Sequence, residues 1–201
     1  MRGGNVRIFG VILAGGEGRR MGGVDKAALL LGGSTLLHRV IARFDPQVDR
    51  LAISANGNPD RLGAGDLAVL ADLVPQGPLS GVLSALDWAA PLGATHVVSV
   101  AVDTPFFPGD LVPQLLLAAE TSPSGSALAE SGGQMHPTFA LWPVGLIADL
   151  RAALARGESR VMAFATRHAA ATARFPDDRA FLNINTAADL ATAEAMLGGQ
   201  G

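Results

Sequence analysis

The stretch VILAGGEGRRMGGVDKAALL, residues 11–30, carries the end of an apolar segment into a loop rich in glycine. Residues 6–13 are β-branched and apolar, which predicts a buried strand. Residues 14–23 contain five glycines, so successive backbone N–H groups can turn inward and bind a chain of phosphates. Arg19, Arg20 and Lys26 add positive charge. The sequence therefore predicts a phosphate-binding loop directly after the first strand.

Lys26 is the only lysine among fifteen basic residues, so the other fourteen are arginines. An ammonium is a compact point charge on a slim stem, and it can enter a crowded site that excludes a planar guanidinium. The alternative is that this lysine survived by chance in a composition rich in Arg, Ala and Gly. Three cations within eight residues favour phosphate binding over a plain surface loop.

Strands and helices alternate outward from this loop. Further strands are expected at 51–54, 67–70 and 96–102. Three helices are expected to alternate with them: one that Ser34 caps, one at 77–88 and one at 109–120. Beyond Glu120 we expect an antiparallel hairpin of residues 127–130 and 135–141, helices at 144–155 and 159–168, strands at 171–175 and 181–184, and a last helix capped by Thr186.

Because the first strands are apolar throughout, they are typical of a parallel sheet covered on both faces. The predicted fold class is α/β: a three-layer αβα, Rossmann-like domain, mainly parallel, with an inserted antiparallel hairpin lobe. Residues 1–201 are expected to form this single domain, with residues 1–120 and 121–201 as its two halves.

Composition excludes several classes of protein. Apolar residues make up 49 % of the chain and charged residues 16 %, which is globular. The formal net charge of −3 gives no basic field for nucleic acid or an anionic membrane. No cysteine is present, so disulfides and thiolate chemistry are excluded. The apolar run near the N-terminus is too short to span a bilayer and lacks a signal-peptide pattern. We therefore expect a cytoplasmic protein.

Polar residues follow the predicted strands at the edge where open parallel sheets bind ligands. They are the Ser54–Asn58 turn, Asp72 and Asp103. Asp103 is a candidate Mg²⁺ ligand, because Mg²⁺ keeps several waters and needs only one or two carboxylates beside substrate phosphates. The alternative is that Asp103 caps the turn before Pro105, and Asp72 has the same ambiguity. The four histidines lack metal-ligand spacing, and His38 and His96 are interpreted as structural.

Two common nucleotide motifs fail to match the glycine loop. Residues 16–21 do not read G-x-G-x-x-G, and no acidic residue closes the second strand to hold a ribose. A P-loop requires Gly-Lys-Ser/Thr, but Asp25 precedes Lys26 and Ala27 follows it. Dinucleotide dehydrogenases and P-loop NTPases are therefore disfavoured.

Together these motifs resemble the molybdenum cofactor guanylyltransferases of the MobA type. The family signature L-A-G-G-x-x-x-R-M-G-G-x-D-K is similar to residues 13–26. Residues 77–81 resemble the family's G-P-L-A-G and residues 103–106 its D-x-P-F/Y. Residues 136–138, 160–162 and 183–186 also resemble family patterns, so the likeness spans almost the whole chain. Ser54 departs from the pattern, because relatives often have Asn there.

The resemblance implies a nucleotidyltransferase fold and transfer of GMP from GTP to Mo-molybdopterin, with release of pyrophosphate. It implies that Lys26 lies at the α-phosphate, Arg20 holds pyrophosphate and Asp103 binds Mg²⁺. The implied GTP-binding residues are Leu13, Ala14, Gly15, Gly16, Lys26, Ser54, Asn56, Asp72, Gly77, Gly81 and Asp103. Candidates on the pterin side are His136, Asn183 and Asn185.

GTP and molybdopterin are thus the expected partners of a monomer, together with other cofactor-biosynthesis proteins and recipient molybdoenzymes. The alternatives are a molybdopterin cytidylyltransferase, a sugar-phosphate nucleotidyltransferase and a non-catalytic GTP sensor. A purine needs the space that glycine leaves at Gly15 and in the 77–81 turn, which favours guanine. Lys26 and Asp103 together favour an enzyme over a sensor.

Overall fold

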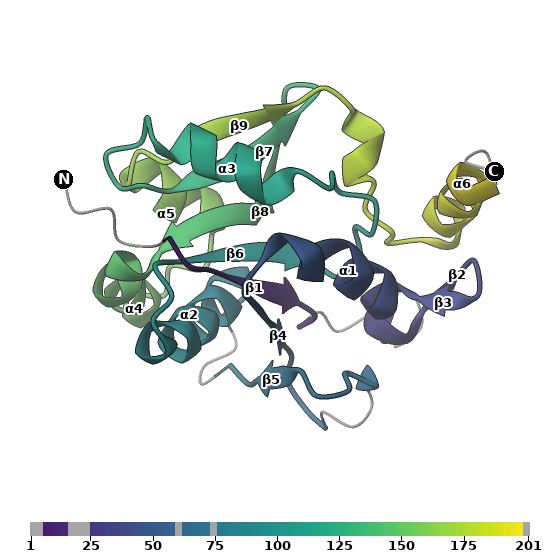
Figure 1. Ribbon diagram of the computed structural model, residues 1–201, viewed down its shortest axis with the longest axis horizontal. Coiled ribbons are helices and arrows are strands. Elements are labelled where there is room, and N and C mark those ends of the chain that lie inside the picture. Colours follow the sequence, from purple (N-terminus) through teal and green to yellow (C-terminus); the bar gives the residue numbers. More distant parts are fainter. Residues whose placement is uncertain (1–5, 16–24, 59–61, 73–75, 199–201) are drawn as a thin grey trace.

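The computed structural model describes residues 6–15, 25–58, 62–72 and 76–198, and they build one seven-stranded sheet of order β5-β4-β1-β6-β8-β7-β9 (Figure 1). Its strands are β1 (Ile8–Leu13), β4 (Arg50–Ser54), β5 (Ala68–Leu70), β6 (His96–Ala101), β7 (Ala127–Ser131), β8 (Gln134–Pro143) and β9 (Ala171–Phe175). β8 runs antiparallel to both of its neighbours, β6 and β7, and the other pairings are parallel. The predicted mainly parallel sheet is confirmed.

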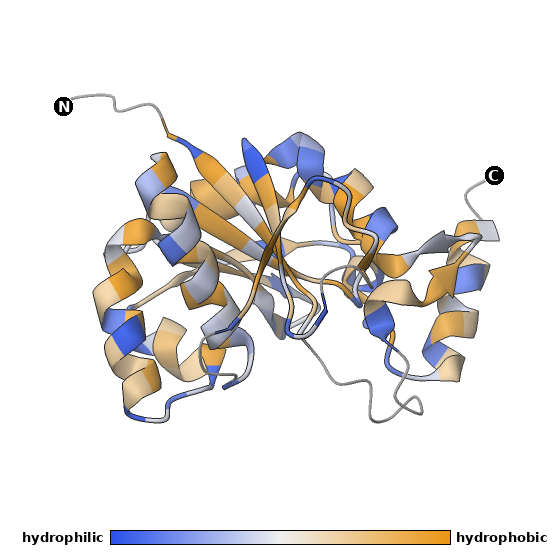
Figure 2. Cartoon of the chain, turned by 90° about the horizontal axis from the view of Figure 1, so that it is seen from below, coloured by the Kyte–Doolittle hydropathy of each residue, from blue (hydrophilic) through white to orange (hydrophobic). Residues whose placement is uncertain are grey.

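Helices cover both faces of this sheet, which makes the three predicted layers. Helices α1 (Leu36–Phe44) and α3 (Leu111–Ala119) pack on one face, in a core that includes Ile8 and Ile12 of β1. Helices α2 (Pro78–Ala89), α4 (Ile147–Ala155) and α5 (Val161–Arg167) pack on the other face, against Phe9 and Val11. Because β1 lies between two cores, its residues are apolar on both sides, and Figure 2 shows the strands coloured mostly as hydrophobic.

The predicted hairpin is present as β7 and β8, joined at Gly132 and Gly133. Both glycines have positive φ, +57° and +81°, as the tight turns that suit hairpins require. β8 is ten residues long, and its second half pairs with β6. The hairpin therefore extends the main sheet rather than forming a sheet of its own.

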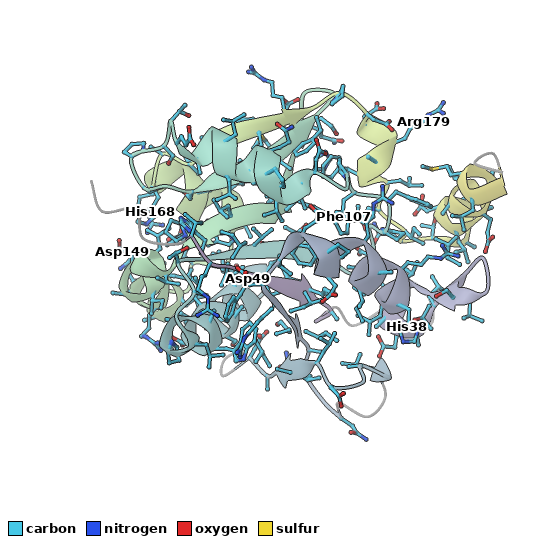
Figure 3. The ribbon with its side chains drawn as sticks, viewed as in Figure 1. His38, Asp49, Phe107, Asp149, His168 and Arg179 are labelled. Atoms are coloured by element: carbon cyan, nitrogen blue, oxygen red, sulfur yellow. The ribbon has the colours of Figure 1, made fainter. Side chains whose placement is uncertain are left out.

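The segment between β6 and α3 is anchored by two phenylalanines. Phe107 (Figure 3) is fully buried. Its ring meets that of Phe44 edge-on, with ring centroids 5.9 Å apart. Phe106, with 9 % of its surface exposed, packs with Leu31 and Ile184 in a third small core. The loop that carries Asp103 is thus held on two sides.

The last helix, α6 (Ala187–Gly198), lies at one end of the molecule beside a two-stranded ladder of β2 (Leu30–Leu31) and β3 (Ser34–Thr35) (Figure 1). Glu194 Oε1 accepts a hydrogen bond from Gly32 N at 2.9 Å, which ties the helix to this ladder. The predicted cap is confirmed, since Thr186 Oγ1 accepts from Asp189 N at 3.2 Å.

Two local predictions are wrong. Ser34 does not cap α1: it pairs with Leu31 in the ladder, and Thr35 Oγ1 accepts from His38 N instead. Residues 181–184 do not form a strand, because a 3-10 turn (Asp178–Phe181) leads into irregular chain. Phe181 and Ile184 are buried there, so the apolar pattern reports burial without a strand partner.

None of the described helices is long and apolar enough to cross a membrane.

Candidate functional site

A cleft opens at the carboxyl ends of β1, β4 and β6, where the sequence predicts ligand binding. Its volume is about 190 Å³. Its lining residues are Leu13, Ala14, Gly15, Lys26, Ser54, Asp72, Gly77, Pro78, Gly81, Ala101, Val102, Asp103, Thr138 and Asn183. The structure thus brings together the predicted GTP-binding residues, with two exceptions. Asn56 is hydrogen-bonded to the cleft residue Asp72, and Gly16 lies outside the described residues, as does Arg20, which was predicted to hold pyrophosphate.

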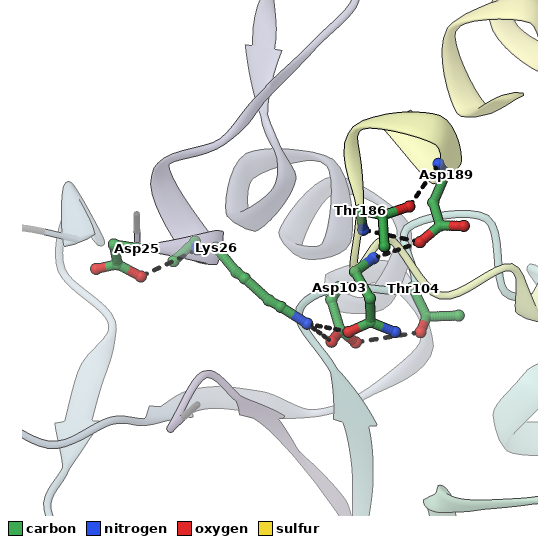
Figure 4. A network of polar contacts seen from close by, with 8 residues as sticks. Asp25, Lys26, Asp103, Thr104, Thr186 and Asp189 are labelled. Atoms are coloured by element: carbon green, nitrogen blue, oxygen red, sulfur yellow. Dashed lines mark hydrogen bonds and ion pairs between the residues drawn. The ribbon is translucent and has the colours of Figure 1, made fainter. Parts of the chain in front are cut away.

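Lys26 and Asp103 form an ion pair at one end of this cleft (Figure 4). Lys26 Nζ donates to Asp103 Oδ2 at 2.7 Å, and the two side chains are each 17 % exposed. The same ammonium also donates to Asn185 Oδ1. Lys26 begins a short 3-10 turn (Lys26–Ala28) that Asp25 caps by accepting from Ala27 N at 3.1 Å. A rigid turn therefore delivers the lysine to two oxygen acceptors.

Asp103 is placed by the end of β6. Its backbone oxygen accepts from Ile184 N at 2.8 Å, which fixes the chain around the carboxylate. The second carboxylate oxygen, Oδ1, receives only a long contact of 3.4 Å from the Thr104 hydroxyl in the described part of the chain. That oxygen therefore retains the acceptor capacity that a hard divalent cation uses. No cluster of three His, Asp or Glu side chains suited to a metal occurs among the described residues.

Asp72 follows β5, which β4 and β1 separate from β6 in the sheet, so it lies away from Asp103 along the cleft, with two polar neighbours. Ser54 Oγ donates to Asp72 Oδ1 at 3.2 Å and Asn56 Nδ2 to Oδ2 at 3.4 Å, while Asp72 N donates to Asn56 Oδ1 at 2.9 Å. Burial raises the pKa of Asp72 above its usual value, and the hydrogen bonds from Asn56 and Ser54 oppose that rise. The carboxylate is thus oriented at the cleft as an acceptor for N–H donors.

The two glycines that border this end differ in what surrounds them. A Cβ on Gly81 would lie 2.5 Å from Ser54 Oγ and 2.9 Å from Leu13 Cδ2, so glycine is required for α2 to pack on β1 and β4. Among the described residues, a Cβ on Gly15 would meet nothing within 4 Å. Both glycines were predicted to make room for a base. No described residue occupies the space at Gly15, whereas protein atoms fill the space at Gly81.

A second, larger pocket of about 760 Å³ adjoins the first, and Thr138 and Asn183 line both. His136 lies in the second pocket, with its ring stacked on Phe181 at 4.2 Å and Nε2 2.7 Å from Ser131 Oγ. Burial lowers the pKa of His136, and Glu130 opposes this shift. One face of this imidazole is therefore occupied by Phe181.

The three predicted pterin-side residues thus lie at different places. His136 is in the second pocket, Asn183 is at the boundary, and Asn185 contacts Lys26 at the end of the first pocket. His38 is exposed on α1 (Figure 3), and burial lowers the pKa of His96, whose Nδ1 is 2.9 Å from Thr95 Oγ1.

The sequence did not predict Thr138 as a pocket residue or Asp189 as a hydrogen-bond partner of Asn185. Thr138 falls within the quoted 136–138 motif, and its position on β8 places it between the pockets. Asp189 follows Thr186 at the spacing of a capping box, which signals a helix start but not a site.

Known proteins resemble this chain in sequence and in fold. The family model described as "MobA-like NTP transferase domain" matches residues 10–173. A molybdenum cofactor guanylyltransferase of Cereibacter sphaeroides is 59 % identical over 192 residues, which cover 96 % of this chain and 98 % of that protein.

Two solved structures share the fold at lower identity. Molybdopterin-guanine dinucleotide biosynthesis protein A of Archaeoglobus fulgidus has a TM-score of 0.76 at 21 % identity, covering 95 % of this chain and 99 % of its own. The Rv0371c protein of Mycobacterium tuberculosis H37Rv, solved in complex with manganese, has a TM-score of 0.70 at 15 % identity, covering 94 % and 99 %.

Proposed function

Because this chain belongs to the family of MobA-like NTP transferase domains, we propose that it transfers GMP from GTP to Mo-molybdopterin, which is molybdopterin with bound molybdenum. A terminal phosphate oxygen of the pterin attacks the α-phosphorus of GTP. One P–O bond forms, the bond to the β-phosphate breaks, and pyrophosphate leaves. The product is the guanine dinucleotide form of the molybdenum cofactor. Such a transfer relies on positioning and charge stabilisation.

One observation carries the proposal. The cleft has the oriented carboxylate of Asp72 at one end, and the Lys26 ammonium beside the Asp103 carboxylate at the other. Guanine presents two adjacent N–H donors, at N1 and N2, that one carboxylate can accept together. Cytosine presents a lone pair at N3, which a carboxylate repels. Asp72 is therefore proposed to bind guanine, while Lys26 lies at the phosphates.

We assign Mg²⁺ to Asp103, whose Oδ1 has acceptor capacity to spare. When bound, Mg²⁺ would neutralise charge on the α-phosphate and on the leaving group. The manganese complex of the Mycobacterium protein supports a divalent ion in this fold. Lys26 donates to the α-phosphate oxygens, and Arg20, outside the described residues, is proposed to hold the departing pyrophosphate.

The second pocket is proposed to bind the pterin, which would make residues 1–120 the GTP and metal half and residues 121–201 the acceptor half. Thr138 and Asn183 line both pockets, so an acceptor phosphate placed between them could approach the nucleotide. His136 and Asn183 are proposed pterin contacts, and Asn185 acts on Lys26. We further propose a cytoplasmic monomer that delivers its product to molybdoenzymes.

The test is pyrophosphate release by the purified protein with each of four NTPs, with and without Mo-molybdopterin. We expect release only with GTP, acceptor and Mg²⁺ together. Equal release with CTP would move the assignment to a cytidylyltransferase. Release that depends on a sugar phosphate instead of the pterin would identify the acceptor as a sugar. GTP binding without pyrophosphate release under any condition would identify the protein as a non-catalytic GTP sensor.

A further inference from the structure

Asp189, in the first turn of α6, holds the segment that supplies the second acceptor of Lys26 (Figure 4). One carboxylate oxygen, Oδ2, accepts from Asn185 N at 3.0 Å and from Thr186 N at 2.8 Å. The side-chain amide oxygen of Asn185 in turn accepts from Lys26 Nζ. Two successive hydrogen bonds, through Asn185, therefore link Asp189 to the lysine.

The bond to Asn185 N goes beyond what the helix requires. In a capping box, the side chain of the third helical residue accepts a hydrogen bond from the backbone N–H of the cap residue. Here Asp189 is that third residue, and it accepts from Thr186 N. The bond from Asn185 N is additional, and it fixes the backbone that bears the lysine's acceptor. On the other side of Asn185, Ile184 N donates to the backbone carbonyl oxygen of Asp103 at 2.8 Å. Asn185 is thus held from both sides.

Electrostatics agree with this geometry. The pKa of Asp189 is lowered, mainly by the hydrogen bond from the Asn185 backbone, with contributions from Thr186 and from the charge of Lys26. The residue is therefore an anion at neutral pH, and its carboxylate is hydrogen-bonded to the segment whose Asn185 side chain contacts Lys26.

Building on the proposed function, we propose that Asp189 is a positioning residue for nucleotidyl transfer. It fixes Asn185 so that the Asn185 amide and the Asp103 carboxylate hold the Lys26 ammonium between them. Asp189 acts through Asn185 and touches neither nucleotide nor acceptor. Its removal should leave GTP binding nearly intact and slow the chemical step, because the ammonium is then free to leave its position at the α-phosphate.

The first test needs no substrate and uses Lys26 as its own probe, since it is the only lysine. An amine-directed acylating reagent is applied, and mass spectrometry follows Lys26 with the Met1 α-amino group as internal reference. Asp189→Ala should raise the Lys26 acylation rate about fivefold, the factor that one ordinary hydrogen bond represents. Thr186→Ala removes the reciprocal cap but leaves an N–H at both positions that Asp189 binds. In the Thr186→Ala variant, Lys26 should be acylated at the wild-type rate.

Both variants should lower the Tm by a similar 2–4 °C or so, as loss of a helix cap does in a protein of this size. Equal acylation rates in the two variants, or an unchanged rate in Asp189→Ala, would reduce Asp189 to a helix cap and overturn the proposal. This result stands even if the protein has no guanylyltransferase activity, so failure of the proposed function is separately visible.

The second test separates binding from chemistry. Asp189→Ala should lower kcat roughly tenfold and change the KM for GTP less than about twofold, because only the transition-state contact of Lys26 weakens. Asp189→Asn keeps a carbonyl oxygen for both N–H donors and should restore most of kcat. An Asn variant as slow as the Ala variant would show that charge acts rather than positioning, and a rise in KM alone would show a binding role. Either result would overturn the proposal.

Discussion

Lys26 Nζ lies 2.7 Å from Asp103 Oδ2, although Lys26 begins a 3-10 turn and Asp103 follows β6, 77 positions later in the chain. From the sequence the two residues were expected to have separate roles, as a phosphate-binding cation and a metal-binding carboxylate. In the ligand-free protein they neutralise each other. A divalent cation at Asp103 Oδ1 and a triphosphate at Lys26 would each add an opposite charge beside one member of the pair, without requiring the bond to Oδ2 to break.

Replacing Asp103 by Asn should keep the fold, because the side chains are nearly isosteric, and should lower Mg²⁺-dependent transfer by about a hundredfold or more. Mn²⁺ binding, followed by electron paramagnetic resonance, should weaken in parallel. Asp87→Asn is the matched control, since Asp87 belongs to an exposed pair with Arg151. Near wild-type turnover of Asp103→Asn at low Mg²⁺ would remove Asp103 as the metal ligand.

Lys26→Arg keeps the charge but widens the head group, and it should lower kcat by about a hundredfold because a guanidinium does not fit between the Asp103 and Asn185 oxygens. Acylation of Lys26 should abolish transfer, and Mg-GTP should slow that acylation without affecting the Met1 amine. A fully active Lys26→Arg enzyme would mean that this lysine persists by chance.

GTP should exceed CTP in kcat/KM by a hundredfold or so, which corresponds to about 3 kcal/mol of base recognition. Asp72→Asn should remove most of this preference, because an amide offers only one acceptor to the two N–H donors of guanine. Asp66→Asn, at an exposed position, serves as the control. Competition assays with paired nucleotides measure the ratio directly, and an unchanged ratio in Asp72→Asn would place base recognition elsewhere.

Gly81→Ala should destabilise the fold by about 1–3 kcal/mol, because its Cβ would press on Ser54 Oγ and Leu13. Displacing Ser54 also disturbs Asp72, so GTP affinity should fall. Gly15→Ala is the contrast: its Cβ would meet no atom of the described residues within 4 Å, so the Tm should be unchanged while nucleotide binding weakens. Urea unfolding and GTP titration of both variants check this pair of outcomes, and a stable Gly81→Ala protein contradicts it.

Stability should fall as the pH drops from about 7 to 5, because burial lowers the pKa of both His96 and His136 below the usual 6.5. In this pH range the two histidines bind protons in the unfolded chain more readily than in the folded protein, which favours unfolding. His136→Gln should flatten the slope of Tm against pH in that range, whatever its effect at pH 8. An equally steep slope in the variant would show that His136 does not contribute.

Apolar pattern predicted the sheet well, because a strand buried on both faces must be apolar along its length. Residues 96–102 were predicted as a strand, and β6 spans His96–Ala101 with every residue after His96 buried. The same reasoning failed at residues 181–184, because Phe181 and Ile184 are buried without a neighbouring strand to pair with. Apolar periodicity reports contact with the core and is silent about where the backbone finds its hydrogen bonds.

The cleft was predictable where a residue directly follows a strand, as Asp72 and Asp103 do, because parallel strands end at one edge. The Lys26–Asn185 contact was not, since no spacing rule connects side chains that meet only through the tertiary fold. Asp189 shows a middle case. The spacing from Thr186 signals a helix cap, but the extra bond to Asn185 N appears only in three dimensions.

The contact between Lys26 and Asn185 also sets an order of events during synthesis. The two residues are 159 positions apart in the chain. At about 5–20 residues per second, a ribosome needs roughly 8–30 s to travel between them. The β2–β3 ladder that follows Lys26 likewise gains its hydrogen bond from Gly32 N to Glu194 only after α6 has been synthesised. The growing chain can therefore pair β1 with β4 and β6 early, but it acquires a completed cation site only after the final helix has been made.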